Sequence, residues 1–81
     1  MKFVIINKQF RPLSYFFPNG NDRVRDIIGF SNYNFIPFYN IKEAENWIKF
    51  MKSKIREREM EVRCWLKICK LIDNLKIVER S

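Results

Sequence analysis

The stretch Asn-Ile-Lys-Glu-Ala-Glu-Asn-Trp-Ile-Lys-Phe-Met-Lys-Ser-Lys, residues 40–54, decides the fold because its start and its apolar period both indicate one amphipathic helix. Asn40 is a favourable N-cap, since its side-chain oxygen can accept from a free backbone N–H, and Glu43 completes a capping-box pattern. Apolar residues then recur at three- and four-residue steps and form one arc roughly 120° wide. These residues are Ile41, Ala44, Trp47, Ile48, Met51 and Ile55. The sequence therefore predicts a helix over 41–57 whose apolar arc lies in the core.

Two short runs of β-branched and aromatic residues near the N-terminus predict strands. They span Lys2–Lys8 and Leu13–Phe17, and the short connection between them favours an antiparallel hairpin. Turn-forming residues follow from Pro18 onward. Phe35–Tyr39 predicts a third short strand, which Pro37 restricts to a sheet edge because proline has no N–H to donate.

Residues 22–30 allow two interpretations. Asp22 could cap a short helix that Gly29 closes in the left-handed conformation. Alternatively, Asp26–Phe30 could be extended, because its isoleucines and phenylalanine also suit a strand.

The segment that follows the long helix, residues 61–72, fits two periodicities. The strand pattern consists of Val62, Cys64, Leu66 and Ile68, and the helix pattern consists of Val62, Trp65, Leu66, Cys69 and Ile72. We favour the strand, with a hairpin turn at Asp73-Asn74 and a final strand over Leu75–Glu79. The predicted fold class is α+β: a small antiparallel sheet packed on one long amphipathic helix, in the order β-β-(short α)-β-α-β-β, as a single domain over residues 1–81.

The net charge of +7 is the main functional hint, because such a charge attracts phosphate backbones or acidic protein surfaces. Two cysteines and no histidine leave no set of ligands for a structural zinc site and no thiol–imidazole pair, so we expect no cofactor and no metal. Cys64 and Cys69 are spaced too far apart for an unstrained disulfide, and reduced thiols fit the cytoplasm. No apolar run approaches the roughly 20 residues that span a bilayer, so we expect no membrane association.

A basic ridge is predicted on the long helix. Lys42, Lys49 and Arg56 recur every seven residues on the side opposite Trp47, and Lys52 lies near them. Such a ridge could lie along phosphates or against an acidic protein patch. A solvated helix face is the alternative interpretation, because exposed helices commonly carry alternating charges.

Arginines and aromatic residues in predicted loops form a second candidate set. Arg11, Arg23 and Arg25 flank the predicted hairpin, and their guanidinium groups can bind phosphate or carboxylate through two hydrogen bonds. Ten of the thirteen aromatic residues fall within the first 40 positions, which is more than a small domain easily buries. Phe10 and Tyr33 lie in predicted loops, and we expect them to be exposed for a protein partner, a dimer or base stacking, with burial in the core as the alternative.

No catalytic arrangement is recognisable in the sequence. Asp22 and Asp26 are the nearest pair of carboxylates, and helix capping explains Asp22 better than acid–base chemistry does. The serines have no neighbouring base. We therefore expect no catalytic residues and no enzymatic activity.

The layout of the chain resembles small accessory proteins of tailed bacteriophages. An N-terminal Met-Lys-Phe-Val-Ile-Ile, a central Phe-Tyr-Asn-Ile-Lys-Glu-Ala-Glu-Asn-Trp-Ile and a closing Leu-Lys-Ile-Val-Glu carry this resemblance. Amino acids with A/T-rich codons make up nearly half of the chain, as in many phages of low-G+C bacteria. The resemblance implies a host-takeover or anti-defence protein in the host cell cytoplasm, and it assigns no functional residue.

We therefore expect a small non-enzymatic protein that binds and inhibits a host protein or nucleoprotein complex, for example an anti-CRISPR or anti-restriction protein. The alternative is a basic nucleic-acid-binding protein that contacts DNA or RNA through the 41–57 helix face and the loop arginines. A homodimer formed through exposed aromatic residues is a third interpretation.

Overall fold

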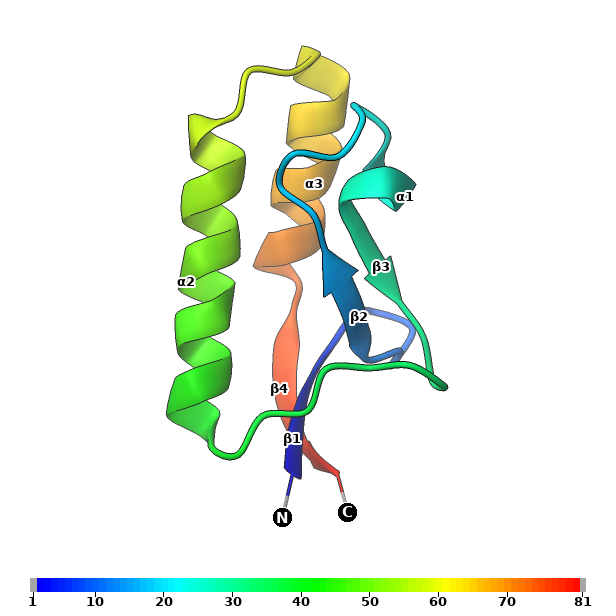
Figure 1. Cartoon of the computed structure of the whole chain (residues 1–81), viewed down its shortest axis with the longest axis vertical. Helices are drawn as coiled ribbons and strands as arrows, with labels where there is room; N and C mark the ends of the chain where they lie inside the picture. Colours follow the sequence, from blue (N-terminus) through cyan, green and yellow to red (C-terminus); the bar gives the residue numbers. More distant parts are fainter. Residues whose placement is uncertain (1, 81) are drawn as a thin grey trace.

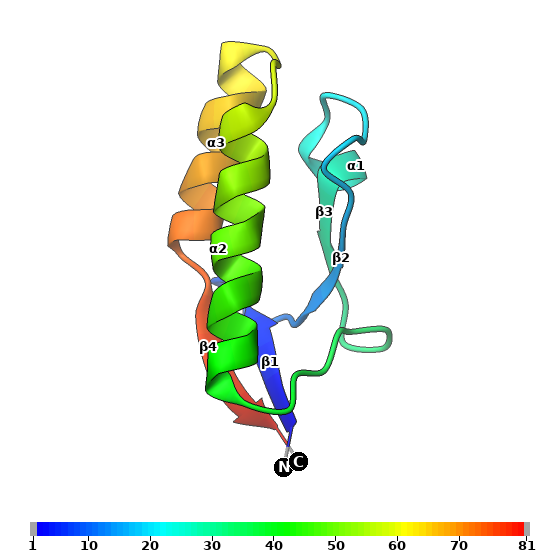
Figure 2. The same ribbon diagram turned by 60° about the vertical axis from the view of Figure 1, so that its left-hand side comes forward.

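The computed structural model describes residues 2–80, which form three helices and four strands (Figure 1). In chain order these are β1 (Lys2–Ile6), β2 (Leu13–Phe16), α1 (Val24–Ile27), β3 (Ile28–Phe30), α2 (Ile41–Glu57), α3 (Val62–Asp73) and β4 (Lys76–Arg80). The strands form two separate antiparallel ribbons, one of β1 with β4 and one of β2 with β3. The helices α2 and α3 lie side by side in opposite directions, and Figure 2 shows β2, β3 and α1 across from them. This arrangement confirms the α+β fold class.

The core lies between the two long helices and the two ribbons. Every helix and three of the four strands contribute to it, together with the segment before α2. The buried cluster contains Ile5, Leu13, Phe16, Ile27, Ile28, Phe38, Ala44, Met51, Ile55, Ile68 and Ile72.

The helix predicted over 41–57 is confirmed as α2. The Asn40 side chain accepts a hydrogen bond from the Glu43 N–H at 2.7 Å, as an N-cap does. The Glu43 carboxylate accepts from the Tyr39 N–H at 3.3 Å, one residue before the position that a capping box would use.

The predicted apolar arc of α2 is largely confirmed. Ala44, Met51 and Ile55 are buried, and Trp47 and Ile48 pack against the core from its border. Ile41 was also predicted to be buried, but it is half exposed. It lies in the first turn of α2, and it is absent from the buried cluster and from the side chains packed against that cluster.

The preferred strand over residues 61–72 was wrong, since this segment is helix α3. Ile68 and Ile72, one helical turn apart, are buried, whereas Val62 and Leu66 are exposed. A strand would place Leu66 and Ile68 on the same face, so only the helical period matches this burial. Two helices therefore cover the strands, and Asp73-Asn74 ends α3 instead of forming a hairpin turn.

The predicted hairpin between the first two strands was also wrong. β1 pairs with β4, with Lys2 opposite Arg80 and Val4 opposite Val78. β1 meets the segment before β2 only at a bridge between Ile6 and Pro12, and Pro12 has no N–H to extend a ladder.

Both interpretations of residues 22–30 are partly realised. Four residues form α1, and the chain then becomes extended in β3. Asp22 does not cap α1, because its N-cap is Arg23, without a side-chain capping bond. Gly29 is not in the left-handed region and instead lies in β3, where a Cβ atom would overlap the ring of Tyr15 on β2.

The predicted strand over residues 35–39 is reduced to a single bridge. Phe3 and Phe38 exchange two backbone hydrogen bonds of 2.8 Å each. Pro37, directly before Phe38, has no N–H with which to continue a ladder. Among the described residues, no helix is both long and apolar enough to cross a membrane.

Candidate functional site

The predicted basic row runs along the solvent-facing side of α2. Lys42, Lys49 and Arg56 are exposed, and their seven-residue spacing sets successive residues about 10 Å apart along a helix. Within residues 2–80, no acidic side chain forms an ion pair with any of the three. The row therefore presents three unneutralised positive charges to solvent.

Lys52 lies on the side of α2 that faces α3. Its Nζ atom is 3.7 Å from the Oδ1 atom of Asp73, at the end of α3. Because both side chains are largely exposed, this ion pair contributes at most about 1 kcal/mol to stability. Lys52 is therefore held weakly and remains available to another acidic group.

A groove of about 280 Å³ lies along the junction of α2 and α3 and is lined by residues of both helices. Its floor is apolar, because the buried Ile55 and Ile72 and the half-buried Cys69 line it. Its rim is formed by Lys52, Arg56, Trp65 and Asp73. We call this feature the α2–α3 groove, and it combines an apolar floor with two cations from α2.

The thiol of Cys69 in the α2–α3 groove has a raised pKa. Burial, and secondarily the carboxylate of Asp73, raise the pKa of Cys69 above its usual value, while the positive charge of Arg56 acts in the opposite direction. The thiol is therefore protonated at neutral pH and contributes to the floor as an apolar group.

Exposed apolar residues of α3 lie beside the groove: Trp65 is part of its rim, and Val62 and Leu66 are outside its lining. Val62 is 69% exposed, Leu66 is 55% exposed and Trp65 is 37% exposed. With Cys69 they recur at the three- and four-residue spacing of one helix face. Apolar side chains gathered in this way on a surface mark a contact with another molecule. The sequence signal for them was the helical pattern of residues 61–72, which we did not favour.

The predicted loop residues lie in two separate regions, of which the first holds Phe10, Arg11 and Tyr33. Phe10 and Arg11 lie in the loop between β1 and β2, and Tyr33 lies in the loop after β3. These two loops are neighbours, because the Ser31 N–H donates to the Pro12 carbonyl at 2.9 Å. Phe10 and Tyr33 are both strongly exposed, as predicted.

Arg23 and Arg25 lie at the opposite end of the β2–β3 ribbon, at and within α1. They are exposed, but the ribbon separates them from Arg11. The three loop arginines therefore cannot act as one cluster, and none of them lines the α2–α3 groove.

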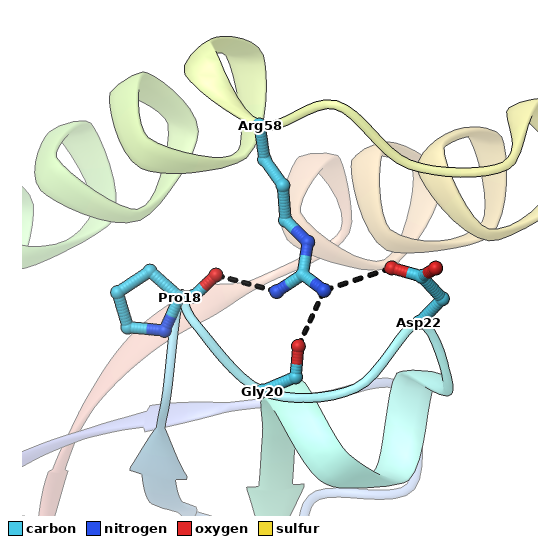
Figure 3. Close-up of polar contacts among 4 residues, drawn as sticks. All are labelled: Pro18, Gly20, Asp22 and Arg58. Atoms are coloured by element: carbon cyan, nitrogen blue, oxygen red, sulfur yellow. Dashed lines mark hydrogen bonds and ion pairs between the residues drawn. The ribbon is translucent and has the colours of Figure 1, made fainter.

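The best-formed polar arrangement involves Arg58, which the sequence did not single out (Figure 3). Its guanidinium donates to the Pro18 carbonyl at 2.5 Å, to the Gly20 carbonyl and to the Asp22 carboxylate at 2.8 Å. The Arg58 side chain is only 15% exposed. Arg58 therefore joins the C-terminal end of α2 to the turn after β2, and the carboxylate of Asp22 binds Arg58 instead of capping α1.

The described residues contain no group of three acidic or cysteine side chains placed to hold a metal ion. Comparisons with models of protein families, with curated proteins and with solved structures found no match for this chain.

Proposed function

We propose that this chain is a small non-enzymatic protein that binds a host protein or nucleoprotein complex and inhibits it through the α2–α3 groove. The observation that carries this proposal is the combination, on one exposed surface, of an apolar floor with a rim that carries two cations, Lys52 and Arg56, and one carboxylate, Asp73. The resemblance of the sequence layout to small phage accessory proteins supports a host component as the partner and the host cytoplasm as the location.

The groove favours an acidic, amphipathic segment of the partner, most simply a helix. Apolar side chains of such a segment would cover Trp65 and Leu66, which are costly to leave in water. Its carboxylates would pair with Lys52 and Arg56 at the rim. The net charge of +7 would accelerate the encounter with an acidic surface.

Affinity purification of the tagged chain from host lysate, with mass spectrometry and with and without nuclease, tests this proposal. We expect a stoichiometric protein that is captured by the native chain and lost with Lys52→Glu/Arg56→Glu or with Leu66→Glu. The matched control is Lys2→Glu/Lys76→Glu, which changes the charge equally at exposed positions on β1 and β4.

Capture that survives both groove variants would contradict the proposal. Light scattering distinguishes binding to a host protein from a further possibility, in which the groove binds a second copy of this chain. A mass that rises with protein concentration and returns to that of a monomer with Leu66→Glu would assign the groove to a homodimer instead.

Nucleic-acid binding through the row on α2 is a second candidate. It is favoured by the three unneutralised cations of the row, and Lys49 and Arg56 also border a shallow depression with Lys52. Glu57 lines the same depression and opposes a phosphate there. Gel-shift titration of DNA and RNA at rising salt tests this candidate, which requires an affinity that falls steeply with salt. Its critical variant is Lys42→Glu/Lys49→Glu/Arg56→Glu.

A further inference from the structure

A second hollow lies on the other flank of α3, where that helix meets the loop between β1 and β2. Its volume is about 250 Å³, and it does not share a residue with the α2–α3 groove. Its lining includes three lysines and three residues with amide side chains: Lys8, Lys67, Lys70, Asn7, Gln9 and Asn74. No lining residue is acidic, and within the described chain none of the three lysines forms an ion pair.

The electrostatic field in this hollow is positive despite the helix that ends beside it. The C-terminal end of a helix such as α3 carries the equivalent of roughly half a negative charge. Lys67 and Lys70 on α3 and Lys8 from the loop are all exposed and line this hollow, and no carboxylate lines it. The lysines therefore outweigh the helix dipole, and the hollow attracts an anion.

The loop on one side of the hollow is rigidly built. The Asn7 side-chain oxygen accepts from the N–H groups of Gln9 and Arg11, both at 3.0 Å. The Asn7 N–H donates to the Arg11 carbonyl at 3.1 Å, and the Asn7 carbonyl accepts from the Phe10 N–H at 3.0 Å. The backbone that carries Lys8 and Gln9 is therefore held in place at the edge of the hollow.

The same loop holds Phe10 in an unfavourable conformation. Its φ of 61° lies in the left-handed region, which a bulky side chain rarely adopts. The side chain is 76% exposed, so burial of the ring does not compensate for this strain. Strained residues concentrate at binding sites, where surrounding contacts hold them in place. Phe10 follows Gln9 in the chain, so it lies beside the lining of the hollow without being part of it.

The size of the hollow restricts the ligand. Pockets that enclose a whole small molecule have volumes of roughly 300 Å³ or more. The hollow is slightly smaller and open, so it suits one charged group of a ligand that continues along the surface. A phosphate group fits three lysines and the amide donors of Asn7 and Gln9, whereas the Asn74 amide already donates to the Lys70 carbonyl. A nucleobase fits an exposed aromatic ring.

We propose that this hollow binds the phosphate group of a nucleotide through Lys8, Lys67 and Lys70, and that the ring of Phe10 stacks on the base. The nucleotide is either free or the 5′-terminal residue of a single strand, since both present the same phosphate and base. This site is independent of the partner proposed for the α2–α3 groove, because no residue lines both.

Titration of the isotopically labelled chain, followed by amide chemical shifts, tests this proposal. The probes are adenosine 5′-monophosphate, inorganic phosphate and adenosine. We expect the first two to shift the signals of residues 7–9 and 67–74, with adenosine 5′-monophosphate binding more tightly and adenosine not binding. Lys67→Gln/Lys70→Gln should weaken binding by about tenfold or more, because two charged contacts are lost.

Lys2→Gln/Lys76→Gln is the matched control, since it removes the same charge from exposed positions on β1 and β4 that lie outside every proposed site. We expect this control to bind adenosine 5′-monophosphate as the native chain does. Phe10→Asn removes the ring while retaining a residue that tolerates the left-handed region. It should weaken binding of adenosine 5′-monophosphate and leave inorganic phosphate unchanged, and Phe10→Gly should do the same.

A 5′-phosphorylated oligoadenylate and its 5′-hydroxyl counterpart separate the two sources of the nucleotide. Tighter binding of the phosphorylated strand than of adenosine 5′-monophosphate assigns a strand end, and the reverse order assigns a free nucleotide. Absence of shifts at residues 7–9 and 67–74, or equal weakening by the two lysine double variants, overturns the phosphate site. Equal affinity of native and Phe10→Asn chains for adenosine 5′-monophosphate overturns the stacking of the base.

Discussion

Arg58 connects two segments that lie almost 40 positions apart, and this gives a single side chain a large share of the stability. We expect Arg58→Met to lower the free energy of unfolding by about 2–3 kcal/mol, because it removes charged hydrogen bonds to Pro18, Gly20 and Asp22. Urea denaturation measures the change. Arg56→Met, two positions away and exposed, is the control and should alter stability by no more than about 0.5 kcal/mol. Equal losses in the two variants would contradict the structural role of Arg58.

Cys69 makes stability depend on pH in the alkaline range. Its pKa is raised in the folded chain, mainly by burial, so the folded state retains the thiol proton when the unfolded chain has lost it. The unfolded state then binds fewer protons, and the free energy of unfolding falls as pH rises through the usual thiol pKa and above it. This contribution is fully present below that pKa. Denaturation at a series of pH values should show a weaker alkaline decline for Cys69→Ala than for the native chain.

The role of Arg58 could not be predicted from the sequence. Two of its three partners are backbone carbonyls, which every residue has, and they become available only after the turn at Pro18–Asp22 has formed. Arg56, by contrast, was predicted to be exposed from its position on the helix period alone, and the structure confirms it.

α2 and α3 differ in how clearly the sequence specifies them. α2 begins at an asparagine that caps it and continues for 17 residues, so its period is unambiguous. α3 has 12 residues, and its N-cap Glu61 makes no side-chain capping bond, so no start signal separates it from a strand. The basic row was therefore predictable, whereas the α2–α3 groove depends on α3 and was not.

Leu66 and Ile68 provide a test of α3 as a helix. In the helix Leu66 is exposed and Ile68 is fully buried, whereas a strand would place both on one face. We expect Leu66→Lys to change the free energy of unfolding by less than about 1 kcal/mol and Ile68→Lys to unfold the chain, because an unpaired charge cannot be buried. Far-UV circular dichroism with urea titration measures both. Similar losses from the two substitutions would favour the strand.

The strand pairings depend on contacts that a local pattern does not contain. β2 is the strand nearest to β1 in sequence, but the segment before β2 contributes only a bridge at Pro12. β1 pairs instead with β4, which follows both long helices in the chain. Residue types predicted that these segments are extended, but they did not predict the partner. Figure 1 shows that β4 continues directly from α3 and lies beside β1.

The whole molecule carries an excess of positive charge that its own ion pairs do not offset. The net charge is +7, and the described residues form three ion pairs, two of which are largely exposed. Mutual repulsion therefore destabilises the folded state, and screening by salt should relieve it. We expect the midpoint of urea unfolding to rise between low salt and about 0.5 M sodium chloride. Lys42→Gln/Lys49→Gln/Lys67→Gln/Lys70→Gln should show a smaller rise, and a fall with salt in the native chain would contradict this balance.

The pairing of β1 with β4 has a consequence for biosynthesis. β1 leaves the ribosome before α2 and α3, but its partner Lys76–Arg80 is made only after both of these helices. Until then the Phe3-Val4-Ile5-Ile6 run remains exposed, and an unpaired apolar strand of this kind is prone to aggregation. Contacts between such distant positions also slow folding, because the chain must close a long loop before they form. A nascent chain that stalls between residues 73 and 76 therefore has all three helices in its sequence and no partner strand for β1.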